Sequence, residues 1–164
     1  VVISSNENAF GLTRARNSKI DTFFENDEKK IIEILKSYRV DLVVLAGYLK
    51  IISKDFVDSF KIINVHPSLI PSFCGKGFYG KKVHQAVIDY GVKVTGATVH
   101  FVDYEADTGA IIRQKVVEVS DFDTVETLSK KVLKIEHEIL IESIKLIKED
   151  KLILDGRKVY ESIN

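Results

Sequence analysis

Asn64 and His66 stand two residues apart where a short apolar segment, residues 61–65, runs into Pro67. In a β-strand, residues i and i+2 point to the same face, so this pair would share one side of the strand end. Pro67 lacks the N–H needed to continue a ladder, which ends the strand where open α/β sheets bind ligands. An amide donor beside a group that titrates near pH 7 suits a reaction that builds an oxyanion and moves a proton. The same pair could instead cap a helix or brace a loop.

A carboxylate also falls within an apolar helical pattern near the C-terminal end. At helical spacing, Glu136 shares a face with Leu128, Val132, Ile139 and Leu140. An ionised group in such a stripe needs a partner. Glu136 would pair with a nearby lysine, face water at the edge of the stripe, or accept a hydrogen bond from a ligand in a crevice.

Cysteine and histidine spacing gives no sign of a metal centre. Cys74 is the only cysteine, which excludes a disulfide framework and a cysteine-based zinc site and suits a reducing cytosol. The four histidines, His66, His84, His100 and His137, lack the HExxH spacing of a zinc-binding helix. The sequence therefore predicts no metal site.

Length and charge point to a single domain that acts on small molecules. The chain has 164 residues, and its 24 basic side chains balance its 24 acidic ones without any long block of like charge. A nucleic-acid or membrane surface is therefore not expected. No apolar run approaches the 18 residues of a membrane span, and no signal peptide opens the chain, so a soluble cytoplasmic protein is expected.

Apolar strands alternate with amphipathic helices along the chain, which predicts an α/β domain with a mostly parallel sheet. Strands are expected at 1–4, 20–24, 41–46, 61–65, 94–102 and 111–119, helices at 8–17, 27–38, 54–60, 81–90 and 124–148, and a final hairpin around Asp155-Gly156. Residues 72–80 lack the GxGxxG spacing of a phosphate cradle and are expected to form a loop that acts as a lid or wall.

The start of the chain suggests that an element precedes it. Residues 1–4 form an apolar strand pattern at once, and the sequence contains no methionine, not even at position 1. We therefore expect residues 1–164 to be one domain that is incomplete at its N-terminus.

Three stretches in order resemble the phosphoribosylglycinamide formyltransferase family: NVHPSLIP at 64–71, VTGATVHFV at 94–102 and DTGAII at 107–112. Residues 6–16 and 42–52 resemble the same family. The resemblance implies a Rossmann-like formyltransferase fold, with helices on both faces of the sheet. It also implies transfer of a formyl group from 10-formyltetrahydrofolate to the amine of 5-phosphoribosylglycinamide, a step of de novo purine biosynthesis.

The resemblance assigns the catalytic set to Asn64, His66 and Asp107. Attack of an amine on a formamide carbon places negative charge on the carbonyl oxygen, which Asn64 and protonated His66 would stabilise. His66 would also assist proton transfer, and Asp107 would hold His66 or an ordered water. Without the resemblance, Asp107 would be a simple turn residue before Gly109. His100 is expected to play a structural or supporting role beside the site.

The resemblance also places the pterin of the folate against five positions. These positions supply apolar walls and backbone groups for a flat polar heterocycle: Leu45, Gly47, Leu49, Ile52 and Val102. From the residues alone, Leu45 and Ile52 would be core positions.

Three further positions are assigned to the nucleotide substrate. Glu136 resembles the residue that contacts it, and Pro67 and Ser68 resemble neighbours that shape the loop beside the catalytic pair. The expected partners are the two small-molecule substrates, without metal, nucleic acid or membrane, in a monomer or homodimer.

Three rival functions stay open. The family holds the substrate phosphate with a Gly- and Ser-containing loop, and nothing before Val1 supplies it, so a non-catalytic folate- or nucleotide-binding module is one alternative. Formyltetrahydrofolate deformylase is another, although it typically has a second histidine at the position of Pro67. Methionyl-tRNA formyltransferase has glycine there and a C-terminal nucleic-acid-binding domain. The sequence upstream of Val1 would distinguish them.

Overall fold

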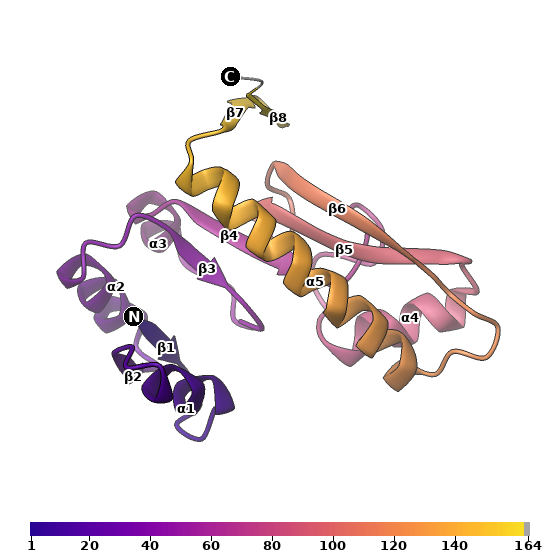
Figure 1. The fold of residues 1–164 in the computed structure, drawn as a ribbon, viewed down its shortest axis with the longest axis horizontal. Coiled ribbons are helices and arrows are strands. Elements are labelled where there is room, and N and C mark those ends of the chain that lie inside the picture. Colours follow the sequence, from indigo (N-terminus) through magenta and orange to yellow (C-terminus); the bar gives the residue numbers. More distant parts are fainter. Residues whose placement is uncertain (163–164) are drawn as a thin grey trace. The chain divides into compact units, whose positions relative to one another are not determined.

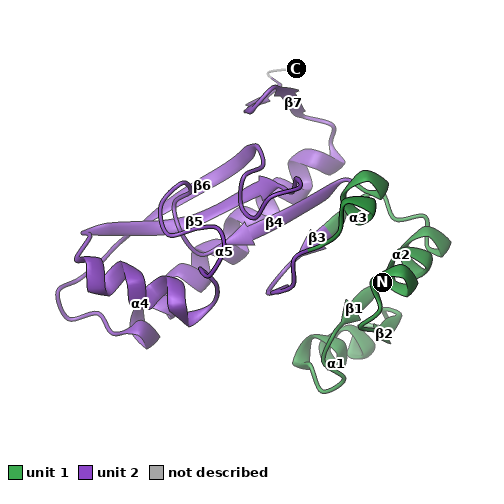
Figure 2. Cartoon of the chain, turned by 180° about the vertical axis from the view of Figure 1, so that it is seen from behind, with its two compact units in different colours: residues 1–43, 52–60 green, residues 44–51, 61–164 purple. Residues whose placement is uncertain are grey.

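The computed structural model describes residues 1–162 as two compact units. The first unit comprises Val1–Val43 and Ile52–Phe60, and the second comprises Val44–Ile51 and the chain from Lys61 onward (Figure 2). None of the helices in the described part of the chain is both long and apolar enough to cross a membrane.

The first unit pairs two short strands with three helices. Its elements are β1 (Val2–Ser4), α1 (Phe10–Asn17), β2 (Thr22–Phe24), α2 (Glu28–Ser37) and α3 (Lys54–Ser59). Strands β1 and β2 are parallel, as the alternating pattern predicted. Helix α2 begins where the Asp27 side chain accepts a hydrogen bond from the Lys29 N–H, and Ser53 caps α3 through the Phe56 N–H. Buried Leu12, Ile31, Leu35 and Phe56 supply apolar packing.

A four-stranded sheet organises the second unit. Its strand order is β3 (Val43–Leu45, whose first residue is counted in the first unit), β4 (Ile62–His66), β5 (Val94–Phe101) and β6 (Ile111–Glu118). β5 pairs antiparallel with both β4 and β6. The β5–β6 pairing agrees with the expectation of two consecutive strands joined by a short connection around residues 107–109. The antiparallel direction of β4 against β5 could not be predicted from the residue pattern of either strand.

Two helices of the second unit contact each other, and the longer one lies along the sheet. Helix α5 (Val125–Lys148) packs against β5 and β6, and α4 (Lys81–Tyr90) contacts α5 (Figure 1). The face of α5 that packs inward carries Leu128, Val132, Ile135, Ile139 and Leu146. Helix α4 ends at Gly91, whose φ of 77° lies in the left-handed region that terminates helices. Both helices start and stop within a residue of their predicted bounds.

A two-stranded hairpin ends the described chain. Strands β7 (Leu152–Asp155) and β8 (Lys158–Glu161) pair antiparallel, as the Asp155-Gly156 turn predicted. An ion pair of 2.6 Å joins the guanidinium of Arg113 in β6 to the carboxylate of Glu161 in β8. The hairpin is thereby attached to the edge of the sheet.

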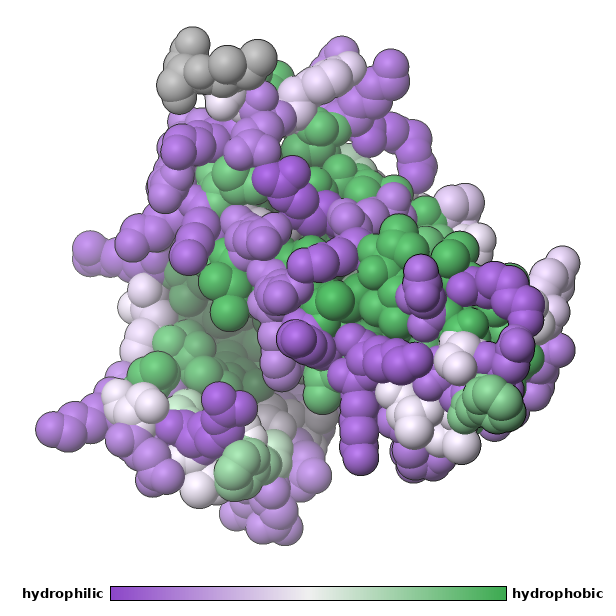
Figure 3. All heavy atoms as spheres, turned by 45° about the vertical axis from the view of Figure 1, so that its right-hand side comes forward, coloured by the Kyte–Doolittle hydropathy of each residue, from purple (hydrophilic) through white to green (hydrophobic). Residues whose placement is uncertain are grey.

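Apolar side chains also reach the surface. On the face drawn in Figure 3, hydrophobic residues are visible among hydrophilic ones. On α5, Leu133 and Ile141 are 48% and 54% exposed. Single apolar residues at the surface are normal for a folded protein and do not by themselves indicate a binding face.

Candidate active site

The predicted pair of polar residues lies at the C-terminal end of β4. Asn64 is half-buried and His66 is buried, and β4 ends at His66, directly before Pro67. In the antiparallel ladder, Asn64 lies opposite His100 and His66 opposite Thr98. Asn64 and His66 therefore share one face of the sheet, as their spacing predicted, with polar residues of β5 beside them.

Asp107 reaches this cluster from the connection between β5 and β6. Its Oδ2 atom lies 3.5 Å from Nδ1 of His66 and accepts a hydrogen bond of 2.8 Å from the Gly75 N–H. Asp107 has a φ of 61°, a left-handed conformation that aspartate tolerates better than most side chains. The structure thus brings together the three residues that the resemblance assigned to catalysis.

The other ring nitrogen of His66 is held by the main chain. Nε2 lies 2.9 Å from the carbonyl oxygen of Phe73, and because a carbonyl only accepts, Nε2 carries a proton. Burial lowers the pKa of His66, although the Phe73 carbonyl and the charge of Asp107 oppose that effect. The neutral ring, with Nδ1 unprotonated, therefore predominates at pH 7.

Asp107 is ionised in this setting. Burial by itself disfavours its charge, but the hydrogen bond to His100, the charge of His66 and the Gly75 N–H outweigh burial and lower the pKa of the carboxyl. The cluster therefore combines a carboxylate with a neutral imidazole at neutral pH.

The structure places His100 directly beside two of the assigned catalytic residues, whereas the sequence indicated only a structural or supporting role near the site. Its Nε2 atom lies 3.3 Å from Nδ2 of Asn64 and 3.5 Å from Oδ1 of Asp107. The alternation of Thr98 and His100 along β5 was visible in the sequence. The signal that was missing is the register of β5 against β4, which places His100 opposite Asn64.

Pro67 and Ser68 lead into a loop that the strands hold closely. The Ser68 hydroxyl donates to the Ser72 carbonyl at 2.5 Å, and the Ser68 carbonyl accepts from the Thr98 hydroxyl at 2.7 Å. Ser68 is fully buried. These contacts agree with the loop-shaping role expected of both residues, and direct contact with substrate stays a prediction.

The positions assigned to the pterin fall in both units. Leu45, Gly47, Leu49 and Val102 belong to the second unit and Ile52 to the first. Leu45, Ile52 and Val102 are half-buried, and Leu49 is 66% exposed. Leu45 and Ile52 are thus not the fully buried core residues that their types alone suggested. The folate pocket stays a prediction.

Glu136 lies on α5 at the border of its buried face. The stripe passes through Ile135 and Ile139, which leaves Glu136 half-buried beside it instead of inside it. Burial raises the pKa of its carboxyl to about 7, and no charge or hydrogen bond from the described residues offsets that effect. Of the readings that the sequence left open, pairing with a nearby lysine therefore has no support in the described structure.

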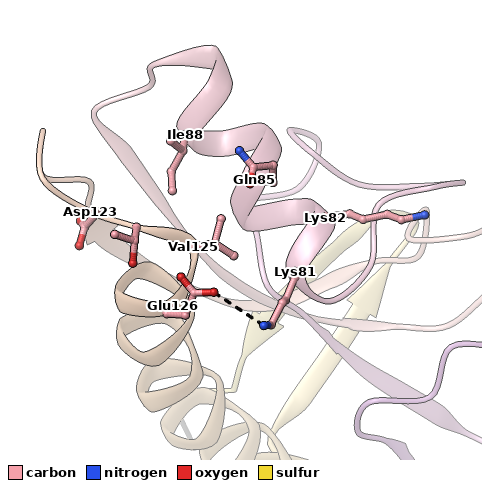
Figure 4. Close-up of a pocket in the computed structure, with 8 residues that line it drawn as sticks. Lys81, Lys82, Gln85, Ile88, Asp123, Val125 and Glu126 are labelled. Atoms are coloured by element: carbon pink, nitrogen blue, oxygen red, sulfur yellow. Dashed lines mark ion pairs between the residues drawn. The ribbon is translucent and has the colours of Figure 1, made fainter.

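A hollow elsewhere in the second unit contains none of the assigned residues. It has a volume of about 540 Å³ and lies between the starts of α4 and α5 (Figure 4). Lys81 and Glu126 meet there in an ion pair of 3.7 Å in which both side chains are largely exposed. Residues 1–162 also contain no group of three or more His, Cys, Asp or Glu side chains placed to hold a metal ion.

Comparisons with known proteins give a consistent picture. A family model described as formyl transferase matches residues 1–144. A chloroplastic phosphoribosylglycinamide formyltransferase of Vigna unguiculata is 40% identical over 175 residues, which cover 99% of this chain and 56% of the relative. The phosphoribosylglycinamide formyltransferase of Haemophilus influenzae is 36% identical over 170 residues, covering 97% and 78%.

Solved structures agree with the sequence matches. Glycinamide ribonucleotide transformylase 1 from Symbiobacterium toebii superposes with a TM-score of 0.91 at 37% identity, covering 99% of this chain and 80% of that one. The chain spans about half the length of the chloroplastic relatives, 56% of one and 43% of another.

Proposed function

Because the chain belongs to the formyl transferase family, we propose that it transfers a formyl group from 10-formyltetrahydrofolate to the amine of 5-phosphoribosylglycinamide. The α/β formyltransferase fold expected from the sequence is confirmed by the likeness to the Symbiobacterium toebii structure. The observation that carries the proposed activity is the meeting of His66, from the end of β4, with Asp107, from the β5–β6 connection.

His66 is arranged to accept a proton at one defined atom. Its Nε2–H is bound to the Phe73 carbonyl, so Nδ1 is the nitrogen with a free lone pair. Nδ1 faces the Asp107 carboxylate at 3.5 Å, close enough to stabilise the imidazolium that forms when Nδ1 takes up a proton. Burial keeps the ring neutral beforehand, which preserves its capacity as a base at pH 7.

In the proposed reaction, the amine nitrogen of the nucleotide bonds to the formyl carbon, and the carbon's bond to the folate nitrogen then breaks. The amine gives up a proton to His66, and the folate nitrogen receives one as it leaves. The Asn64 amide and the imidazolium of His66 stabilise the negative charge on the formyl oxygen between these two events. The folate and nucleotide are the only other reactants, so atoms and charge balance.

The experiment that tests this function uses the purified chain with both substrates. We expect formylated 5-phosphoribosylglycinamide to appear in mass spectra in step with loss of 10-formyltetrahydrofolate. Release of formate at the same rate without the amine would instead favour a deformylase. Binding of either substrate without turnover would favour a non-catalytic binding module.

We propose that Glu136 holds the nucleotide and that Leu45, Gly47, Leu49 and Val102 contribute to the folate pocket. A half-buried carboxylate without a counter-charge is costly unless a ligand satisfies it, and a sugar hydroxyl or an ammonium group would do so. We further propose that Ile52, Pro67 and Ser68 complete the two binding sites. The partners of the chain would then be small molecules.

Glu136→Gln is expected to raise KM for the nucleotide by about 10-fold or more and to leave KM for the folate unchanged, because it removes one charged hydrogen-bond acceptor. The same change should raise Tm at pH 8 more than at pH 5. Above a pKa of about 7 the carboxylate is ionised and its desolvation destabilises the folded state, whereas at pH 5 it is already protonated.

Steady-state kinetics with each substrate varied in turn, together with thermal melts at the two pH values, check this prediction. Glu33→Gln is a matched control, because Glu33 is exposed on α2. Equal changes in both KM values would contradict a specific contact between Glu136 and the nucleotide.

A further inference from the structure

Phe73 combines a bond to His66 with an unusual backbone conformation. Its carbonyl oxygen accepts the hydrogen bond from Nε2–H of His66 at 2.9 Å. Its φ of 49° lies in the left-handed region, where a bulky side chain is rarely found and costs free energy. Contacts elsewhere in the structure must therefore hold the backbone of Phe73 in this conformation.

Two other aromatic rings contact the ring of Phe73. Phe78, later in the same loop, packs edge-on against it with ring centroids 6.3 Å apart, and Tyr90, the last residue of α4, does so at 5.9 Å. The interplanar angles of 70° and 80° are those of T-shaped pairs, which stabilise beyond the area that they bury. We call the rings of Phe73, Phe78 and Tyr90 the aromatic clamp.

The aromatic clamp joins the loop to a helix that is itself anchored. Val83 and Val87 of α4 are fully buried, and α4 contacts α5. The Phe78 N–H donates to the Gly75 carbonyl at 3.1 Å, which holds the third ring close to the start of the loop. The ring of Phe73 therefore packs against partners whose own positions are fixed.

We propose that Phe73 is a positioning residue, whose ring is held by the aromatic clamp so that its own carbonyl stays on Nε2 of His66. Phe73 acts through His66, so its effect on the rate rests on the proposed formyl transfer, whereas its effect on the imidazole itself does not. The backbone makes the contact, and the ring keeps the backbone on its course. Another large side chain at position 73 could take the place of the ring, but a small one could not.

Several charged groups act on His66 besides this carbonyl. Burial lowers the pKa of His66, whereas the Phe73 carbonyl and then the charge of Asp107 raise it. A charge on His100 lowers it, and on α4 burial and the charge of His66 together lower the pKa of His84. Without the carbonyl, burial is less opposed, so the pKa of His66 should fall further. The acidic limb of the kcat/KM profile should then move to lower pH.

Two substitutions at position 73 separate the position of the backbone from the packing of the ring. Phe73→Ala is expected to lower kcat by about 10-fold or more with little change in either KM, because His66 loses a hydrogen bond that stabilises its charged form. Phe73→Gly leaves a larger void, but glycine adopts positive φ without steric cost and should retain more activity than alanine. Nitrogen NMR titration of the ring should show a lower His66 pKa in Phe73→Ala.

Tyr90→Ala tests the aromatic clamp at a distance from the site. Tyr90 is 78% exposed, so its removal should leave the fold intact. We expect kcat to fall by about 2- to 10-fold, which corresponds to the loss of one aromatic pair, and Tyr90→Phe should recover the activity. Phe122→Ala is the matched control, since Phe122 is 93% exposed before α5, and its turnover should stay within about 2-fold.

A rate loss in Phe73→Ala with an unchanged His66 titration would overturn the proposal and assign the ring to packing alone. Unchanged turnover, or alanine more active than glycine, would overturn it as well. If Phe73→Ala does not fold, the His66 titration in Tyr90→Ala decides in the same way. The titration needs no turnover, so a shifted His66 in a chain that transfers no formyl group would support the aromatic clamp and reject the proposed function.

Discussion

His66→Ala is expected to lower formyl transfer by about 100-fold or more while leaving the fold intact, and Asp107→Asn should do the same. Nδ1 of His66 lies 3.5 Å from the Asp107 carboxylate and is the nitrogen left free to accept a proton, and alanine removes it. Asp107→Asn keeps the size of the side chain but removes the charge that stabilises the imidazolium. The measurement is single-turnover and steady-state formylation of the amine, with circular dichroism to verify folding.

Two substitutions of the same chemistry outside the site serve as controls. His137→Ala removes an exposed imidazole from α5, and Asp41→Asn removes an exposed carboxylate before β3. Both should retain turnover within about 2-fold, as expected for surface changes that touch no reacting group. Near-native turnover of His66→Ala would sink the mechanism, whatever the controls show.

Gly109→Ala should lower the free energy of unfolding by about 3 kcal/mol or more, the upper end of overpacking effects. A Cβ at position 109 would lie 1.7 Å from the carbonyl oxygen of Phe101 and 2.7 Å from its carbon. These are backbone atoms at the end of β5, so they cannot turn aside as a flexible side chain would. The neighbouring bond from the Phe101 N–H to the Ala110 carbonyl, 2.8 Å long, would have to shift with them.

Urea denaturation of Gly109→Ala and of Gly11→Ala measures this effect against a matched change. Gly11 lies in α1, and a Cβ there meets nothing within 4 Å. Alanine at that position should stabilise the protein by about 0.5–1 kcal/mol, because glycine loses more chain entropy in a helix. Equal stability of the two variants would show that the β5–β6 junction can rearrange freely.

The sequence was sufficient for the elements and for the local part of the site. Periodicity placed α4 and α5 within a residue of their ends, because apolar spacing and a terminating glycine such as Gly91 act within a few residues. The spacing of Asn64 and His66 likewise determined a shared face, since a strand alternates with period two.

What the sequence could not predict depends on strand pairing. His100 meets Asn64 only because β5 runs antiparallel to β4 in one register, and a shift by one residue would turn His100 to the other face. Neither strand's own pattern encodes that register. The helix pattern around Glu136 left a place at the edge of the apolar stripe open. Ile135 completes the buried stripe in the structure, which puts Glu136 at its border.

The atoms that hold the acid–base pair belong to the main chain of a short loop. The Phe73 carbonyl binds His66, and the Gly75 N–H binds Asp107. Every residue type has a carbonyl and every type except proline has an N–H, so substitutions at 73 and 74 can change side chains without deleting either contact. Related sequences can therefore diverge at these positions and retain the site, provided that the loop keeps its length and backbone course. A comparison by residue identity alone would therefore miss that backbone atoms of this loop hold His66 and Asp107 in place.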